Sequence, residues 1–245
     1  MKTFYLTDSG KVRDHNEDSV IIVKNKNDEY LMVVSDGMGG HSTGEIASSL
    51  TIMHLAKGFS ELETIGAKTE TVNWLRKNVN EINHKIFKYT DNHGESKGMG
   101  ATLVVAILTK EFLLFGNIGD SSGFVLKDNK LYKITHDHTL VNLLVSTGEL
   151  TEEEAKDHPK KNVLMKALGA NDPVEMDIFD VNTDIDAILL CSDGLTNMLT
   201  MEQIERVLNS ELDIEEKVIK LIRKSNNRGG NDNVSIAYLV KESGD

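Results

Sequence analysis

The chain has 245 residues, of which 39% are hydrophobic and 27% charged, and its formal net charge is -12. This composition is that of an ordinary globular protein with a core of useful size. The acidic balance argues against a nucleic-acid backbone or an anionic membrane as the main partner, because both bind a clustered basic face.

The single cysteine and the amino-terminal segment predict the compartment. One cysteine, Cys191, excludes an internal disulfide and any multi-cysteine zinc site, and its place in an apolar run indicates a buried structural thiol. Asp8 interrupts the opening segment before a signal-peptide core could form, and no apolar run reaches the length of a membrane span. We therefore expect a cytoplasmic protein with no membrane insertion.

Short runs rich in Val, Ile and Leu, bounded by Gly, Asn or Asp, are typical of buried strands. In chain order they are SVIIV (19–23), YLMVV (30–34), ATLVVAIL (101–108), FLLFGNIG (112–119), AILLC (187–191) and VSIAYLV (234–240). Between the second and third runs, apolar residues recur at steps of four and three over 73–89, which predicts an amphipathic helix. Thr151 and Thr200, each followed three residues later by Glu or Gln, predict capping boxes that open two further helices.

The order of these elements predicts the fold class. Strands dominate the opening, and helices and strands then alternate without the even rhythm of a parallel sheet, which favours an α+β fold with sheets covered by helices. Only Pro159 and Pro173 occur, and no stretch rich in Ser, Gly or Pro could serve as a linker. We expect one domain over residues 1–245, without internal repeats.

Acidic residues stand at the ends of five of the predicted strands. They are Glu17, Asp18, Asp36, Asp120, Asp193 and Asp232. Crowded carboxylates repel one another and cannot all ionise unless cations lie among them, and hard ions such as Mg²⁺ and Mn²⁺ prefer oxygen ligands. A metal pair is one interpretation of this pattern. From spacing alone the alternative stays open that these are turn residues on different sides of the fold.

Seven motifs together indicate a family. They are RDHNED, SDGMGGHSTGEIAS, GMGATLV, GNIGDSS, THDHTL, AILLCSDGL and GGNDNVS, in this order. With them the sequence resembles the metal-dependent protein phosphatases of the PPM family, type 2C-like, in their bacterial form, over nearly the whole chain. The resemblance implies a four-layer α-β-β-α sandwich, in which two antiparallel sheets are flanked by helices, and a dinuclear Mn²⁺ or Mg²⁺ centre in a cleft at one end.

The resemblance also implies a role for each acidic residue. Asp36 would bridge two ions, and the carbonyl of Gly37 would bind one of them. Asp193 and Asp232 would hold the second ion, while Glu17 and Asp18 would act directly or through metal-bound water. Asp120 corresponds to a ligand of a possible third ion. Such a metal pair lowers the pKa of a shared water toward about 7, so that hydroxide attacks phosphorus in line without a covalent phosphoenzyme.

Other positions follow the family pattern or depart from it. Arg13 would bind the substrate phosphate through its planar guanidinium, and His41 is a possible accessory group of the active site. Met38 replaces a histidine that can act as the acid in eukaryotic-type relatives, and Ser122 replaces a common arginine. Residues 140–165, which we name the flap segment, match a mobile flap beside the active site of bacterial members.

These observations predict a serine/threonine phosphoprotein phosphatase that opposes a bacterial Ser/Thr kinase. Its partners would be phosphoprotein substrates and that kinase, with no nucleic acid, and the chain would be a monomer. Two alternatives remain at this point. One is a phosphoprotein-binding module without metals, against which intact Asp36, Asp193 and Asp232 argue. The other is a calcium-binding structural protein, suggested by GGNDNVS alone, although calcium repeats of that kind work as arrays.

Overall fold

The computed structural model describes residues 1–39 and 43–242. Its strands are β1 (Lys2–Asp8), β2 (Asp18–Lys24), β3 (Tyr30–Met38), β4 (Gly100–Ala101), β5 (Leu103–Leu108), β6 (Leu113–Ile118), β7 (Ser122–Lys127), β8 (Lys130–Lys133), β9 (Asp177–Val181), β10 (Ala187–Cys191) and β11 (Val234–Val240). Its α-helices are α1 (Thr43–Ser60), α2 (Lys68–Asn92), α3 (Leu140–Ser146), α4 (Glu152–Lys156), α5 (Asp193–Thr196), α6 (Met201–Leu208) and α7 (Ile214–Asn227). A short 3₁₀ helix covers Gly94–Ser96.

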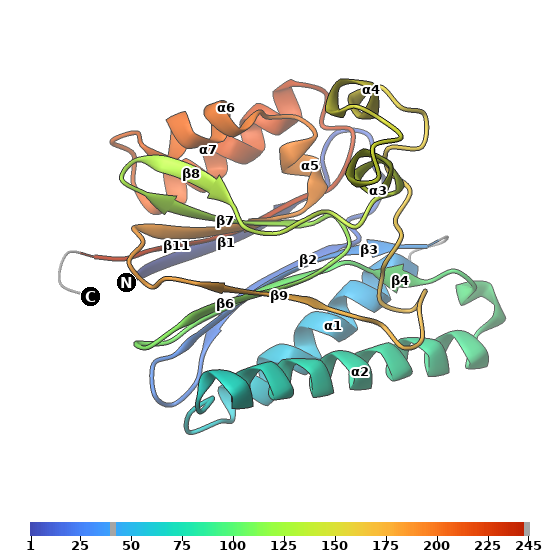
Figure 1. The fold of residues 1–245 in the computed structure, drawn as a ribbon, viewed down its shortest axis with the longest axis horizontal. Coiled ribbons are helices and arrows are strands. Elements are labelled where there is room, and N and C mark those ends of the chain that lie inside the picture. Colours follow the sequence, from blue (N-terminus) through green and yellow to red (C-terminus); the bar gives the residue numbers. More distant parts are fainter. Residues whose placement is uncertain (40–42, 243–245) are drawn as a thin grey trace.

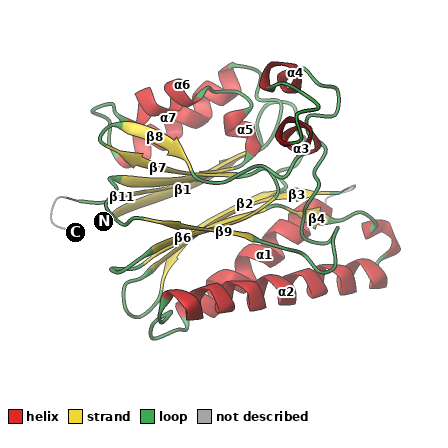
Figure 2. Cartoon of the chain, in the orientation of Figure 1, coloured by secondary structure: helices red, strands yellow, loops and turns green. Residues whose placement is uncertain are grey.

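The strands form two antiparallel sheets that lie face to face. One has the order β1-β11-β10-β7-β8, and the other has the order β2-β3-β5-β6-β9 with β4 paired to the end of β3. Helices α5, α6 and α7 lie outside the first sheet, and α1 and α2 lie outside the second (Figures 1 and 2). The expected α-β-β-α sandwich is therefore confirmed, and α3 and α4 of the flap segment stand together at one end of it.

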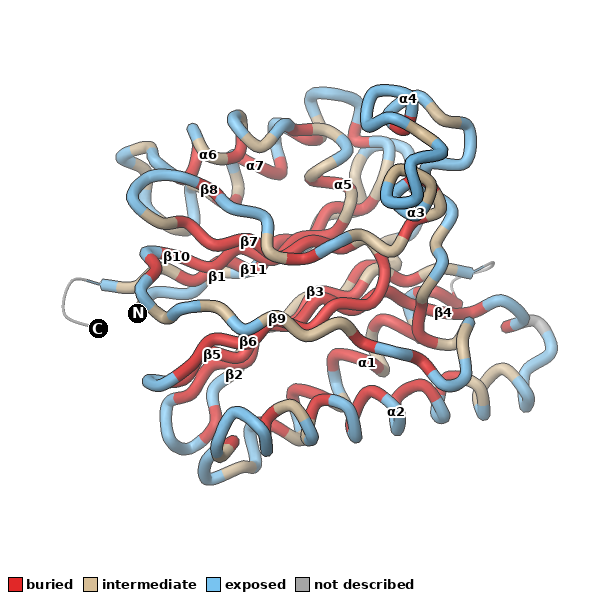
Figure 3. Tube along the Cα trace, viewed as in Figure 1, coloured by how far each residue is buried: buried red, intermediate tan, exposed pale blue. Residues whose placement is uncertain are grey.

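Strand β3 shows why the apolar runs are continuous rather than alternating. Met32 and Val34 belong to the core between the sheets, whereas Leu31 and Val33 pack into the core beneath α1 and α2. A strand covered on both faces buries every side chain, so it needs an unbroken apolar sequence. In Figure 3 the tube is coloured buried through the strands of both sheets, and exposed residues lie on the outer turns of α2.

The predicted helices are present, and α2 buries the apolar face that its sequence predicts. Helix α2 contains the periodic segment 73–89, and Leu75, Val79, Ile82 and Ile86 are all buried in the outer core. The capping box of α4 is complete, since Thr151 Oγ1 accepts from Glu154 N at 3.2 Å and Glu154 Oε2 accepts from Thr151 N at 2.9 Å. No helix among the described residues is long and apolar enough to cross a membrane.

The strand pattern missed the interior strand β7 and two further kinds of feature. Strand β3 continues through Asp36 to Met38, because β4 pairs with Gly37 and Met38 and so extends the ladder past the apolar run. Strands β1 and β8 lie at sheet edges with many exposed residues, so they lack the apolar run that marks a buried strand.

Candidate metal centre and active site

A cavity of about 440 Å³ lies at the end of the sandwich where α5 and β4 stand (Figure 1). Its walls include most of the residues that the sequence singled out, namely Arg13, Glu17, Asp36, Gly37, Asp120, Asp193 and Asp232. Asp18 lies buried behind this wall and is 6% exposed. The alternative that these acidic residues lie on different sides of the fold is therefore wrong.

The β2–β3 pair brings the first carboxylates together. Asp18 and Asp36 face each other in the antiparallel register, and Gly37 N donates to the Glu17 carbonyl at 3.1 Å. A side chain at Gly37 would place its Cβ 2.1 Å from the carbonyl oxygen of Gly44 in α1. Glycine is required there because the helix begins directly against the strand.

Asp193 reaches the same cavity at the start of α5, immediately after β10. Asn197 Nδ2 donates to Asp193 Oδ2 at 2.9 Å, which orients the carboxylate. A Cβ on Gly194 would lie 1.9 Å from the carbonyl oxygen of Asn233, so this turn packs tightly against the residue that follows Asp232. The Ser-Asp-Gly stretch at Asp193 and the GGNDNVS motif thus meet by close backbone approach.

Hydroxyl groups hold the buried member of the cluster. Ser192 Oγ donates to Asp18 Oδ2 at 2.6 Å and accepts from Ser235 N at 2.9 Å. The other oxygen, Asp18 Oδ1, is buried without a hydrogen-bond partner, and so is Asp193 Oδ1. Buried polar atoms normally have partners, so these two oxygens are acceptors in need of a ligand.

Crowding raises the pKa of four carboxyl groups. Burial, assisted by the neighbouring charges, raises the pKa of Asp18 and Asp120 to about 7 and that of Asp193 to about 6. Burial followed by the charges of Asp18 and Asp193 raises the pKa of Asp36 well above its ordinary value. Cations placed among these groups would remove the repulsion and keep them ionised.

The donor set fits Mg²⁺ or Mn²⁺. Both ions prefer carboxylate, carbonyl and water oxygens, and Mg²⁺ keeps several waters rather than taking an all-protein cage. Within the described part of the chain, no three acidic, histidine or cysteine side chains form a ready-made coordination shell. The carboxylates therefore form an open cluster, in which the two partnerless oxygens of Asp18 and Asp193 remain to be satisfied.

Asp120 is positioned by the turn after β6. Gly119 has a φ of +97°, and a Cβ there would meet the Thr102 side chain at 2.6 Å. Gly119 N donates to His138 Nδ1 at 3.1 Å, and the opposite ring nitrogen of His138 lies 3.1 Å from Asp177 Oδ2. The His138 ring thus ties the turn at Asp120 to the start of strand β9.

Arg13 lies beside the cluster, on the segment that precedes β2. Its Nη2 donates to Asp232 Oδ2 at 2.8 Å, and this hydrogen bond raises the pKa of the guanidinium. The Arg13 side chain is 52% exposed, so its remaining donors are open to a ligand in the cavity. Its expected contact with phosphate stays a prediction.

Asn233 was missed by the sequence reasoning. Its Nδ2 donates to the carbonyls of Ser9 (3.0 Å) and His15 (2.9 Å), and its Oδ1 accepts from Glu17 N at 2.9 Å. One buried amide therefore fixes the segment 9–17, which carries Arg13 and Glu17. The signal available in the sequence was its place next to Asp232 in GGNDNVS.

Four positions from the sequence analysis remain, namely His41, Met38, Ser122 and Cys191. His41 lies outside the described residues, and Met38 lines the cavity. Ser122 Oγ makes only long contacts, 3.4 Å to Asp137 Oδ1 and 3.5 Å to the Asp120 carbonyl. Cys191 is fully buried, which raises the pKa of its thiol far above its ordinary value and confirms a structural role.

Comparisons with known proteins agree with this geometry. The family model described as protein phosphatase 2C matches residues 10–233. The serine/threonine phosphatase stp of Listeria welshimeri is 40% identical over 242 residues, which cover 98% of this chain and 96% of that protein. The protein phosphatase PhpP of Streptococcus pneumoniae is 33% identical over 240 residues, covering 98% and 97%. The crystal structure of serine/threonine phosphatase Stp1 from Staphylococcus aureus superposes with a TM-score of 0.93 at 35% identity, covering 99% of this chain and 95% of that one.

Proposed function

The chain belongs to the protein phosphatase 2C family, and from this premise we propose that it is a serine/threonine phosphoprotein phosphatase with a dinuclear Mn²⁺ or Mg²⁺ centre. The observation that carries the proposal is the convergence of Asp36, Asp193 and Asp232 on one cavity, with buried acceptor oxygens that lack partners. A binding module without metals would have no use for carboxyl groups held at raised pKa values.

Each acidic residue keeps the role that the family resemblance implies. Asp36 would be shared by the two ions, the Gly37 carbonyl would hold one of them, and Asp193 and Asp232 would hold the other. Glu17 and Asp18 would contribute directly or through water, and Asp120 would be a ligand of a possible third ion. When bound, the ions supply Lewis-acid activation of water for direct attack on phosphorus.

The chain's own residues position the substrate and shape the site. Arg13 binds phosphate oxygens with the guanidinium donors that Asp232 leaves open, which orients the phosphoryl group toward the carboxylates. Asn233 keeps Arg13 and Glu17 at the rim of the cavity, and Ser192 holds Asp18 in place. No side chain needs to become a covalent nucleophile, and the buried Cys191 could not be one.

The proposal extends to the organisation of the chain and to its partners. Residues 1–245 form a single phosphatase domain, because Met32 of one sheet and Leu190 of the other share one core. The protein acts as a monomer on phosphoserine and phosphothreonine in proteins modified by a bacterial Ser/Thr kinase. The names of the relatives support this substrate class.

The test is hydrolysis of a small aryl phosphate and of a phosphothreonine peptide by the purified protein. We expect turnover of both substrates with added Mn²⁺ and loss of turnover with excess chelator, restored when Mn²⁺ is added back. A folded sample that binds Mn²⁺ but hydrolyses neither substrate would contradict the proposal and favour the binding-module alternative.

A further inference from the structure

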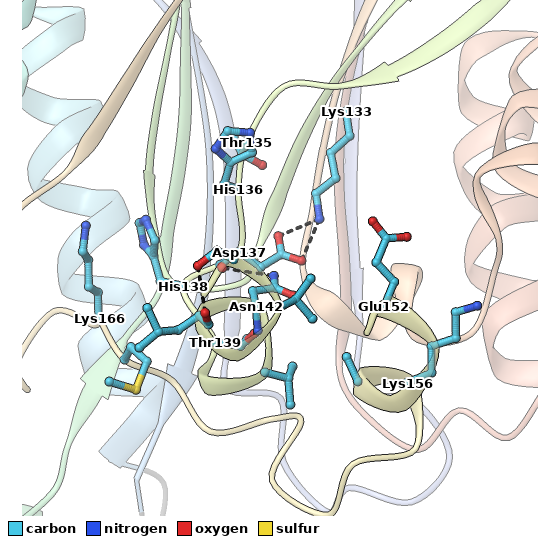
Figure 4. A pocket seen from close by; sticks show the side chains of 16 residues that line it. Lys133, Thr135, His136, Asp137, His138, Thr139, Asn142, Glu152, Lys156 and Lys166 are labelled. Carbon is cyan, nitrogen blue, oxygen red and sulfur yellow. Dashed lines mark hydrogen bonds and ion pairs between the residues drawn. The ribbon is translucent and has the colours of Figure 1, made fainter. Parts of the chain in front are cut away.

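A second and larger cavity lies next to the catalytic one. It has a volume of about 890 Å³ and is enclosed by residues 133–146, by α4 and by the pair Met165 and Lys166 (Figure 4). We name it the flap groove, since α3 and α4 of the flap segment form much of its wall. None of the residues proposed to bind metal or phosphate lines it.

The two cavities are adjacent and share part of their lining. Met165 and Lys166 line both of them. Backbone hydrogen bonds of 2.8 Å from Met165 N to the His138 carbonyl and from Leu140 N to the Val163 carbonyl hold this wall against the start of α3. A chain segment bound in the catalytic cavity can therefore continue across Met165 into the flap groove.

The lysine side chains that line the groove are already paired with carboxylates. Lys133 pairs with Asp137 at 2.6 Å, Lys156 with Glu153 at 2.7 Å, and Lys166 with Asp177 at 3.1 Å. Figure 4 shows Lys166 and His138 on one side of the groove and Glu152 and Lys156 on the other. An acidic ligand would have to displace one of these ion pairs, so the described residues that line the groove offer no unpaired lysine or arginine.

The apolar part of the lining is what remains to bind a ligand. Val141 and Ala155 form buried wall, while Leu143 and Met165 are 46% and 44% exposed. When a second apolar group covers a large apolar side chain that is partly exposed, apolar surface leaves water and the free energy falls. The groove therefore suits an apolar occupant.

Building on the proposed function, we propose that the flap groove is a substrate subsite that receives an apolar side chain of the phosphoprotein, close in sequence to the phosphorylated residue. The occupant is the substrate polypeptide because the groove adjoins the catalytic cavity, with Met165 and Lys166 lining both. An extended chain advances about 3.3–3.6 Å per residue, so the apolar residue stands within a few positions of the phosphothreonine.

The experiment uses phosphothreonine peptides in which a single leucine is moved through the positions on either side, in a serine-rich host. We expect one position at which leucine raises kcat/KM by about tenfold over serine, mainly through a lower KM. Equal rates for all members of the panel would overturn the subsite.

Two exposed apolar residues of the flap segment provide a matched pair of variants. Leu143→Ser removes part of the groove wall, whereas Val163→Ser changes a side chain of similar exposure, 43%, that lines neither cavity. The leucine advantage, with each variant's peptide rates divided by its own aryl phosphate rate, should fall to about twofold or less in Leu143→Ser and stay about tenfold in Val163→Ser.

Other results would assign the groove differently. If Leu143→Ser lowered the rates of all peptides equally, Leu143 would only maintain the structure of the flap segment, and the proposal of a substrate subsite would be wrong. A concentration-dependent dimer that Leu143→Ser disrupts, without any leucine preference, would assign the groove to a second copy of the chain. Failure to hydrolyse either substrate overturns the proposed function as well, whereas hydrolysis of both without a leucine preference overturns the subsite alone.

Discussion

Arg13 and Asp232 are joined by an ion pair of 2.8 Å across 219 positions of sequence, and the pair stands at the rim of the catalytic cavity. It connects the cation expected to bind phosphate with a carboxylate expected to bind metal. Because both side chains are well exposed, at 52% and 33%, solvent screens the pair and its contribution to folding is small.

Arg13→Ala should therefore affect substrate binding much more than stability. We expect KM for the phosphothreonine peptide to rise on the order of tenfold, because a charge-assisted contact to phosphate is lost. The free energy of unfolding should change by about 1 kcal/mol or less. Lys11→Ala, which removes an exposed cation from the same segment, is the control for a general charge effect and should leave KM unchanged. Urea unfolding and steady-state kinetics measure both quantities.

Asp193→Ala should abolish turnover while the protein stays folded. We expect kcat to fall on the order of a thousandfold or more, because the residue serves the ions rather than the core. Its Oδ1 lacks a partner and burial raises the pKa of its carboxyl to about 6, so the fold gains little from the charge. In chelator, the melting temperature of Asp193→Ala should equal that of the wild type or be slightly higher.

A stabilisation assay separates this loss from unfolding. Mn²⁺ should raise the melting temperature of the wild type, since a ligand that binds only the folded state stabilises it, and should do so much less in Asp193→Ala. Asp186→Ala removes an exposed carboxylate just before the start of β10 that accepts from Asp128 N at 2.7 Å, so it should keep the wild-type activity and the wild-type Mn²⁺-induced shift even if its melting temperature falls. Full activity of Asp193→Ala would show that the proposed ligand assignment is wrong.

The buried strands and the acidic residues at their ends could be predicted from local sequence, whereas the four-layer sandwich and the meeting of those acidic residues at one site were implied only by the family resemblance. Strands covered on both faces, such as β3 and β10, carry unbroken apolar runs, and Asp36 and Asp193 follow those runs in matching Ser-Asp-Gly sequences. Edge strands such as β8 carry a weaker pattern, because solvent covers one side of them and tolerates polar residues.

The supporting contacts could not be predicted because they join distant segments through single side chains. Ser192 meets Asp18 across 174 positions, and Asn233 meets Glu17 across 216. No periodicity encodes such pairs. The flap groove likewise exists only because residues 138–140 hydrogen-bond to residues 163–165, and that pairing leaves no motif in the sequence.

Glu29 provides a test of stability that is independent of catalysis. This carboxylate is 7% exposed in the turn before β3, and it accepts hydrogen bonds from Ile65 N at 2.7 Å, Thr64 Oγ1 at 2.9 Å and the Asn25 amide. Burial alone would raise the pKa of Glu29, but these hydrogen bonds outweigh burial and lower the pKa below its ordinary value. The ionised form therefore stabilises the fold.

The sign of the pH effect follows from linkage. The stabilisation from Glu29 is present above the unfolded pKa of 4.5 and is lost as the pH falls through the lower folded value. Glu29→Gln should lose about 1–3 kcal/mol at pH 7 and should show less acid dependence than the wild type. Glu61→Gln, at an exposed position in the turn after α1, is the control for urea unfolding at each pH. Unchanged stability of Glu29→Gln at pH 7 would refute the argument.

Asn233→Ala should damage catalysis through the segment that it holds. The variant leaves Glu17 N and the carbonyls of Ser9 and His15 without their partner, and we expect a loss of about 1–3 kcal/mol of stability. Because Arg13 and Glu17 then lose their fixed position, KM for the peptide and the Mn²⁺ concentration for half-maximal activity should both rise. A purely structural role would lower the stability and leave these two constants unchanged at a temperature where the variant is folded. Asn231→Ala, at an exposed position two residues earlier, should alter neither constant nor stability, which makes the comparison specific to the buried amide.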